Sequence, residues 1–334
     1  LNTRQYIYLD CQLLNTIRTT DNLSYPESQE KISAILHQPL LRNEKSAISL
    51  FSRIYYNTIN GIGYHILADD VKLYQYTKQL VEVMETEMLL SAGYLGNYIG
   101  SLHNLTVTEL RLYKLDEALI HLYKLAEFQK QHADKISDRT KTLINSSLAM
   151  NKLTYLGYRG SKTETITFIN QVELQLSTAY KKMDYRYLVH IYYSIAYTAF
   201  KFAEYDIAIK YLNLLSLEST TGKLDKYLQR GYRLLMLMVH LEMGNYRLLQ
   251  YMVISTYRYL LKTGNLTQFD KAIIALIRSK TMDKKVLLKF HKQLLVVEAN
   301  KFEAQELTHL DAIAWVKSKL EKKPFIEVYR RNLN

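Results

Sequence analysis

Between Pro39 and Pro324 the sequence contains no proline, and its 334 residues include only three prolines and 11 glycines. Proline removes a helix hydrogen bond and glycine costs conformational entropy in a helix, so the scarcity of both favours long helices. Apolar residues recur at i, i+3, i+4 and i+7 almost throughout, and no sustained period-2 alternation appears. The sequence therefore predicts an all-α fold.

The helical pattern breaks at short polar or glycine-containing segments, which set the expected helix boundaries. Gly244 is expected to end one helix in a left-handed conformation, and Asn265 or Thr267 to cap a later one. We expect helices over residues 4–20, 27–37, 43–61, 68–89, 91–113, 115–131, 135–158, 162–181, 185–203, 205–217, 222–243, 245–263, 265–280, 283–306, 309–321 and 325–332.

One helix-pair pattern recurs along the chain, at intervals of about 42 residues. Its clearest copy lies in residues 192–212, a second in residues 102–122 and a third in residues 236–253. In the clearest copy, Ala196 and Ala208 stand where two packed helices would approach most closely. Because one helix pair cannot bury its apolar surface alone, a stacked array of such pairs is expected.

The clearest copy resembles the tetratricopeptide repeat. Tyr192 stands at the first aromatic position of that motif, Ile195 and Ala196 replace its Leu-Gly, and Tyr205 and Ala208 match its second helix. The interval exceeds the roughly 34 residues of that family, so the chain is most similar to degenerate, long-helix repeat proteins of bacteria, including peptide-receptor solenoids. The resemblance implies a right-handed α-α superhelix (a solenoid) of antiparallel helix pairs.

We expect a single tetratricopeptide-like domain over residues 1–334. Residues 1–42 would form N-terminal helices that continue an upstream region outside this sequence. Residues 43–264 would form about five helix-pair repeats, and residues 265–334 basic capping helices. Trp315, the only tryptophan, would either seal these last helices against the array or contact a partner.

In proteins of this kind the first helix of each pair lines a concave groove. The resemblance implies that this groove is lined by His103, Val107, Arg111, Asn151, Tyr155, Tyr193, Tyr197, Lys201, Leu234, Met238 and Glu242. Tyrosine supplies rigid apolar area, asparagine can hydrogen-bond a peptide backbone, and the cations can pair with a carboxylate. The set fits a protein or peptide partner. The alternative is that the tyrosines pack between neighbouring helices.

The sequence carries no recognisable reaction chemistry. It lacks a glycine-rich phosphate loop, a HExxH metal motif and a Gly-x-Ser-x-Gly nucleophile elbow. Cys11, the only cysteine, excludes an internal disulfide and fits a reducing compartment. No run approaches the ~18 apolar residues needed to span a bilayer. We therefore expect a cytoplasmic, non-enzymatic scaffold with no cofactor and no metal.

Two further sequence features are compatible with other functions. The net charge is +12, and residues 271–334 hold 14 basic and seven acidic residues. This basic end could attract nucleic acid or an anionic membrane surface, although lysines interleaved with Leu and Glu are typical of a solvated helix face. The chain also begins without Met inside a helical pattern. It could therefore belong to a peptide- or ligand-responsive regulator whose effector, such as a DNA-binding region, lies in a missing N-terminal part.

Overall fold

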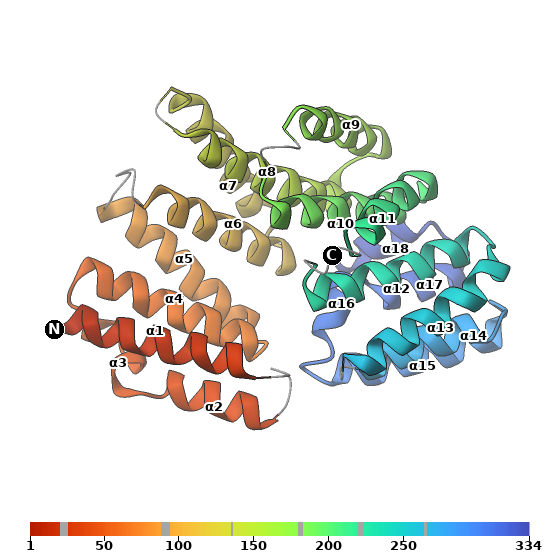
Figure 1. Cartoon of the computed structure of the whole chain (residues 1–334), viewed down its shortest axis with the longest axis horizontal. Coiled ribbons are helices and arrows are strands. Elements are labelled where there is room, and N and C mark those ends of the chain that lie inside the picture. Colours follow the sequence, from red (N-terminus) through yellow and green to blue (C-terminus); the bar gives the residue numbers. More distant parts are fainter. Residues whose placement is uncertain are drawn as a thin grey trace. The chain divides into compact units, whose positions relative to one another are not determined.

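The computed structural model describes residues 1–20, 26–87, 94–134, 136–179, 183–219, 224–263 and 266–333. Within these ranges every regular element is helical and no strand occurs, which confirms the predicted all-α fold (Figure 1). The chain divides into two compact units, Leu1–Asn145 (unit 1) and Ser146–Asn334 (unit 2), with the boundary inside helix α8. No helix of the described part has the length and hydropathy to cross a membrane.

Unit 1 is built from helices that pack mainly against near neighbours along the chain. Its elements are α1 (Asn2–Thr19), α2 (Pro26–Leu36), α3 (Pro39–Arg42), η1 (Glu44–Ser46), α4 (Leu50–Ile66), α5 (Asp70–Glu87), α6 (Leu95–Arg111), α7 (Leu115–Gln131) and the first part of α8 (Asp138–Arg159). One core cluster joins α1, α2 and α4 through fully buried Tyr6, Leu13, Ile32 and Ile59.

Unit 2 also packs mainly between near neighbours along the chain, and its helix Lys226–Glu242 in addition contacts the helices Tyr185–Lys201 and Gln268–Arg278. Its further elements are α9 (Lys162–Ala179), α10 (Tyr185–Lys201), α11 (Tyr205–Ser219), α12 (Lys226–Glu242), α13 (Tyr246–Lys262), α14 (Gln268–Arg278), α15 (Lys284–Ala299), α16 (Gln305–His309), α17 (Ala312–Glu321), α18 (Phe325–Tyr329) and η3 (Arg330–Leu333). Ala196 and Ala208 are fully buried where α10 and α11 pack. The superhelical arrangement and the repeat identity stay predictions.

Most predicted helices lie within a few residues of their expected bounds, and two differ for local reasons. The helix expected over residues 43–61 is α4, which begins later because Ser49 and Ser52 form a capping box. The helix expected over residues 283–306 is two helices, α15 and α16, because Asn300 leaves the helical conformation. Asn300 Oδ1 then accepts the backbone N–H of Phe302 (3.1 Å).

The same turn closes several of the helices. One residue after the helix adopts a left-handed conformation, and the next N–H donates to the carbonyl five residues earlier, as in a Schellman motif. The left-handed residues are Ala68, Tyr113, Ala203, Gly244 and Lys322. The returning hydrogen bonds are Asp69 to Tyr64 (2.9 Å), Lys114 to Glu109 (2.8 Å), Glu204 to Ala199 (2.9 Å), Asn245 to His240 (3.0 Å) and Lys323 to Ser318 (3.0 Å). Gly244, expected to end a helix in this way, does so.

Replacing Ala203 by glycine is expected to raise the free energy of unfolding by about 1 kcal/mol, because a Cβ at positive φ is sterically unfavourable and glycine lacks one. Ala203 has φ 59° and an exposed side chain, so no packing is lost. Ala126→Gly, at an exposed position inside α7, is the matched control and is expected to lower stability by about 1 kcal/mol. Urea unfolding followed by circular dichroism measures both. If the two substitutions changed the free energy of unfolding in the same direction, the explanation from positive φ would be wrong.

Candidate functional site

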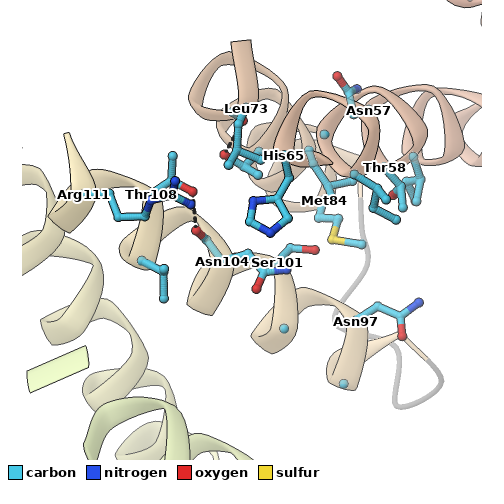
Figure 2. A pocket seen from close by; sticks show the side chains of 18 residues that line it. Asn57, Thr58, His65, Leu73, Met84, Asn97, Ser101, Asn104, Thr108 and Arg111 are labelled. Atoms are coloured by element: carbon cyan, nitrogen blue, oxygen red, sulfur yellow. Dashed lines mark hydrogen bonds between the residues drawn. The ribbon is translucent and has the colours of Figure 1, made fainter. Parts of the chain in front are cut away.

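Unit 1 contains an open cleft of about 530 Å³ between α4 and α6, with α5 as its floor. Figure 2 shows His65 projecting from α4 towards Ser101 and Asn104 on α6, with Met84 of α5 beside it. The volume falls within the range of ordinary ligand sites, and the lining combines apolar side chains with hydroxyls and amides.

The spacing of the lining residues follows the helical period. On α6 the cleft is lined by Asn97, Ser101, Asn104, Thr108 and Arg111, which recur every three or four residues and so share one face. The buried residues on the rest of α6, including Leu102, Leu105 and Leu110, anchor the helix in the protein interior. A single helix thereby presents a polar stripe to the cleft.

Glycines keep the α6 side of the cleft open. A Cβ built at Gly96 or Gly100 would meet no atom within 4 Å, so neither glycine is needed for helix packing. Gly63 on α4 differs, because a Cβ there would lie 2.6 Å from the Leu36 side chain on α2. Glycine inside a helix costs about 1 kcal/mol relative to alanine. Gly96 and Gly100 therefore fit a site where the backbone of another molecule approaches α6 closely.

Two polar groups in the cleft wall have unused hydrogen-bonding capacity. Arg111 Nη2 pairs with Asp70 (2.8 and 3.0 Å), whereas Arg111 Nε is buried with no hydrogen-bond partner among the described residues. Asn57 Nδ2 donates to the Arg53 carbonyl (2.9 Å), whereas its buried Oδ1 accepts nothing from the described part of the chain. An unpaired buried polar atom costs about 1–3 kcal/mol, so such atoms point to a functional role or a missing partner.

The surroundings of His65 favour its neutral form. Burial in the cleft lowers the pKa of its imidazole, the charge of Arg111 lowers it further, and Asp70 partly opposes the change. A neutral imidazole offers one donor and one acceptor, which suits a peptide amide.

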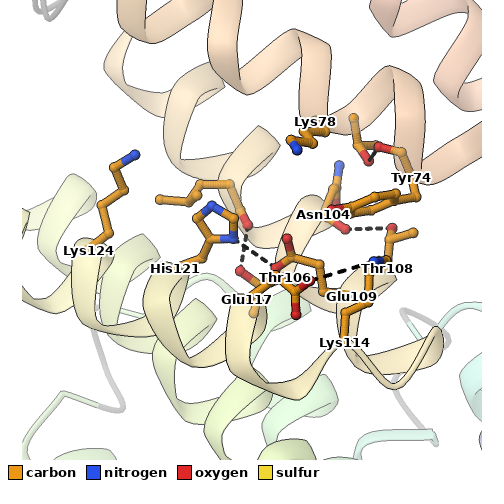
Figure 3. A network of polar contacts seen from close by, with 12 residues as sticks. Tyr74, Lys78, Asn104, Thr106, Thr108, Glu109, Lys114, Glu117, His121 and Lys124 are labelled. Atoms are coloured by element: carbon orange, nitrogen blue, oxygen red, sulfur yellow. Dashed lines mark hydrogen bonds and ion pairs between the residues drawn. The ribbon is translucent and has the colours of Figure 1, made fainter.

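A second polar network fixes α6 to α7 and so positions the cleft wall (Figure 3). Glu109 is buried on α6 and accepts a hydrogen bond from His121 Nδ1 on α7 (2.8 Å). Lys124, also on α7, pairs with Glu85 of α5 (2.7 Å). These contacts are structural cross-links. Within the described ranges, no group of three or more His, Cys, Asp or Glu side chains could hold a metal ion.

The three groove residues predicted on α6 are placed differently with respect to the cleft. Val107 and Arg111 line it. His103 is half-buried on the same helix but is not among the lining residues, because it lies off the stripe that contains Asn104.

The other predicted groove residues lie in unit 2, where the chain's own C-terminal segment contacts Tyr197, Lys201 and Glu242. Residues 305–333 (the C-terminal segment) comprise α16, α17, α18 and η3. Tyr197 Oη accepts the backbone N–H of Asp311 (2.9 Å), and Glu242 accepts from Trp315 Nε1 (2.5 Å). The space left beside Tyr193 and Leu234 is a cavity of only about 140 Å³.

The remaining residues of the predicted groove are buried or half-buried. Leu234 and Met238 are 3% and 0% exposed and belong to the core cluster of unit 2. Asn151 is buried and Tyr155 is half-buried on α8. Partner binding by these residues stays a prediction, and in this structure their neighbours come from the same chain.

Lys201 is the most unusual member of this predicted set. It is 2% exposed, and its Nζ lies 4.7 Å from the ring centroid of Tyr197, 4.6 Å from Tyr329 and 5.8 Å from Tyr158. Burial, with a smaller contribution from the nearby charge of Arg330, lowers the pKa of Lys201 to about 7. The aromatic faces and the nearby Asp311 carboxylate partly offset this cost to the cation.

Arg330 holds the end of the C-terminal segment on α8. Its guanidinium donates to the carbonyls of Leu156 (3.1 Å), Gly157 (3.2 Å) and Gly160 at the C-terminal end of that helix. A cation is favoured there by the helix dipole and by the unpaired carbonyls. Because Tyr329 directly precedes Arg330, the same contact helps to hold the Tyr329 ring over Lys201.

Sequence reasoning did not find Asn57, His65, Asn97 and Asn104, which give the cleft its polar character. A local signal for Asn97 and Asn104 is present. Gly96, Asn97, Gly100, Ser101 and Asn104 place small and amide side chains on one face of the helix, between the apolar and aromatic positions Tyr98, Ile99, Leu102 and Leu105. The α4 side has no comparable signal, because Asn57 and His65 lie among apolar and aromatic neighbours.

Comparison of this chain with protein-family models, with curated proteins and with solved structures finds no match.

Proposed function

We propose that this protein is a non-enzymatic scaffold that binds an extended peptide segment of a partner protein in the cleft of unit 1. The observation that carries the proposal is the polar stripe of α6 with its open glycines, facing His65 across the cleft. The tetratricopeptide-like pattern of the sequence supports the same function. The regulator with an upstream effector remains a second prediction from sequence, and no contact in the cleft favours it.

The dimensions of the stripe suit a short extended peptide. Asn97 to Arg111 covers about 21 Å at ~1.5 Å per helical residue. An extended chain advances ~3.3 Å per residue, so the stripe matches about six residues. The amides of Asn97 and Asn104 can pair with peptide N–H and C=O groups, and the glycines let the peptide backbone approach α6.

The charge of the cleft favours a carboxylate near its Arg111 end. Arg111 Nε has no partner in the described part, and an acidic side chain or a C-terminal carboxylate could accept from it. Arg111 Nη2 already donates to Asp70, so the site would bind one acidic group and not a cluster of acidic groups.

A phage-displayed library of random hexapeptides, panned on the full chain, tests the proposal. Enriched peptides are expected to bind the wild type, to lose at least about tenfold in affinity for Asn97→Ala/Asn104→Ala, and to bind Asn15→Ala/Asn213→Ala normally. The control asparagines are exposed on α1 and α11. Peptides that bind all three proteins alike, or the absence of enrichment, would remove the cleft as the binding site.

Gly100→Ala separates stability from binding. Alanine is expected to raise the free energy of unfolding by about 1 kcal/mol, because the new methyl meets no protein atom and helix propensity improves. The same methyl would stand where the peptide backbone approaches, so affinity for the selected peptides is expected to fall. Thermal melts and fluorescence polarisation give the two readouts. A variant that is more stable and binds unchanged would contradict the proposed peptide path.

A further inference from the structure

The outer face of α15 in unit 2 combines exposed lysines with exposed apolar side chains. Leu288, Leu295 and Val296 are 42%, 43% and 66% exposed. Four lysines are exposed on the same helix: Lys284, Lys285, Lys289 and Lys292. The inner face of α15, with Phe290 and Leu294, is buried in the core of unit 2, so the helix is held with this outer face towards solvent.

Several other cations of the basic C-terminal part form ion pairs. Lys319 pairs with Glu242, Lys323 with Glu327, and Arg331 with Glu321 and Glu327. The α15 lysines form no ion pair with any residue in the described ranges. The nearest acid on the chain is Asp283, whose carboxylate caps the first turn of α15 through the Val286 N–H (2.9 Å). Glu298 is the single acidic residue within α15 and lies at its far end.

The positive charge therefore concentrates along about 12 Å of one helix, from Lys284 to Lys292 at ~1.5 Å per residue, and the apolar side chains follow the same face. Exposed apolar residues beside lysines are what a peripheral membrane-binding face requires, because the cations meet lipid phosphates while the apolar groups enter the boundary of the acyl chains. Duplex nucleic acid would pair its phosphates with the lysines but would not bury the apolar side chains of Leu288 and Val296.

We propose that the outer face of α15 binds the surface of an anionic phospholipid bilayer, with the helix lying parallel to the membrane plane. This inference does not depend on the peptide cleft, which lies in unit 1. The protein would attach without inserting a helix across the bilayer, and its attachment would weaken as salt screens the lysines.

Co-sedimentation of the full chain with vesicles tests the proposal. Vesicles of phosphatidylcholine with about a third phosphatidylglycerol are expected to bind the wild type, and pure phosphatidylcholine vesicles are not. Lys285→Gln/Lys289→Gln/Lys292→Gln is expected to lower the partition coefficient about a hundredfold. The matched control Lys31→Gln/Lys130→Gln/Lys226→Gln removes the same charge from exposed positions on α2, α7 and α12 and is expected to reduce binding much less.

A second variant distinguishes lipid from nucleic acid. Leu288→Ser/Val296→Ser keeps every lysine and is expected to lower vesicle binding about tenfold, because two apolar groups no longer enter the bilayer boundary. Duplex DNA at the same salt serves as the comparison. The proposal is overturned if neutral vesicles bind equally, if the two triple variants behave alike, or if DNA binds more tightly than vesicles and the serine variant binds vesicles normally.

Discussion

Replacing Lys201 by methionine is expected to raise the free energy of unfolding at pH 7 by about 2 to 4 kcal/mol. Lys201 is 2% exposed, and its pKa falls from 10.5 to about 7 in the folded chain. Folding therefore removes a favourable hydrated charge, and this cost is only partly offset by the rings of Tyr158, Tyr197 and Tyr329. Methionine has a similar length and no charge to bury.

The stabilising effect of Lys201→Met is expected to depend on pH in a definite direction. Between pH 7 and 10.5 the unfolded chain holds a proton on Lys201 that the folded chain has released, so the contribution of Lys201 to stability rises with pH across that window. Below about pH 7 the cost is complete and constant. The advantage of Lys201→Met over the wild type is therefore expected to shrink by about 3 kcal/mol between pH 7 and 9.5.

Asp311, Tyr197 and Tyr329, which also lie near Lys201, have pKa values outside the range from pH 7 to 9.5. Burial raises the pKa of Asp311 to about 6, and it raises the pKa values of Tyr197 and Tyr329 well above the usual value for tyrosine. Urea unfolding at several pH values measures the difference between variant and wild type. Lys262→Met, at an exposed site at the end of α13, is the control and is expected to change stability little at any pH. A pH-independent difference for Lys201→Met would show that Lys201 stays charged in the folded protein.

The helices were predictable because their signal is local. Apolar periodicity, capping residues such as Thr267 and the glycine at position 244 act within a turn or two of the chain, and the structure places them as expected. Ala68, Tyr113 and Ala203 adopt the same left-handed turn without being glycine, so residue type alone could not reveal it. Their conformation follows from the packing of the helices that they join.

The sequence left open whether the last helices seal against the array or contact a partner, because the covering of α10 and α12 depends on contacts between distant parts of the chain. Tyr197 and Lys201 carry the residue types of a ligand-binding face, and the sequence pattern cannot tell a partner's peptide from residues 305–333 of the same chain. The contacts of Asp311 with Tyr197 and of Arg330 with Gly157 join residues more than a hundred positions apart. Only the folded path of the chain brings them together.

Glu242→Ala is expected to lower the free energy of unfolding of unit 2 by about 3 kcal/mol. The Glu242 side chain is 8% exposed and accepts from Trp315 Nε1 (2.5 Å) and from Lys319 Nζ (2.7 Å) on α17. Removing the carboxylate leaves the indole N–H of fully buried Trp315 without an acceptor, which costs about 1–3 kcal/mol. Lys319 is 28% exposed, so solvent reduces the loss from its side.

Trp315 is the only tryptophan of the chain, so its fluorescence reports directly on whether α17 keeps its contact with Glu242 of α12. Glu242→Gln keeps an acceptor for the indole and is expected to recover about half of the lost stability, because only the charge is missing. A double-mutant cycle of Glu242→Ala with Trp315→Phe, followed by circular dichroism because the Trp315→Phe variants lack the fluorophore, is expected to give a coupling energy of about 1–2 kcal/mol. If Glu242 were a solvent-facing groove residue that waits for a peptide, the alanine variant would unfold at the wild-type urea concentration and the coupling would vanish. A measured coupling instead identifies Glu242 as a residue that ties the C-terminal segment to α12.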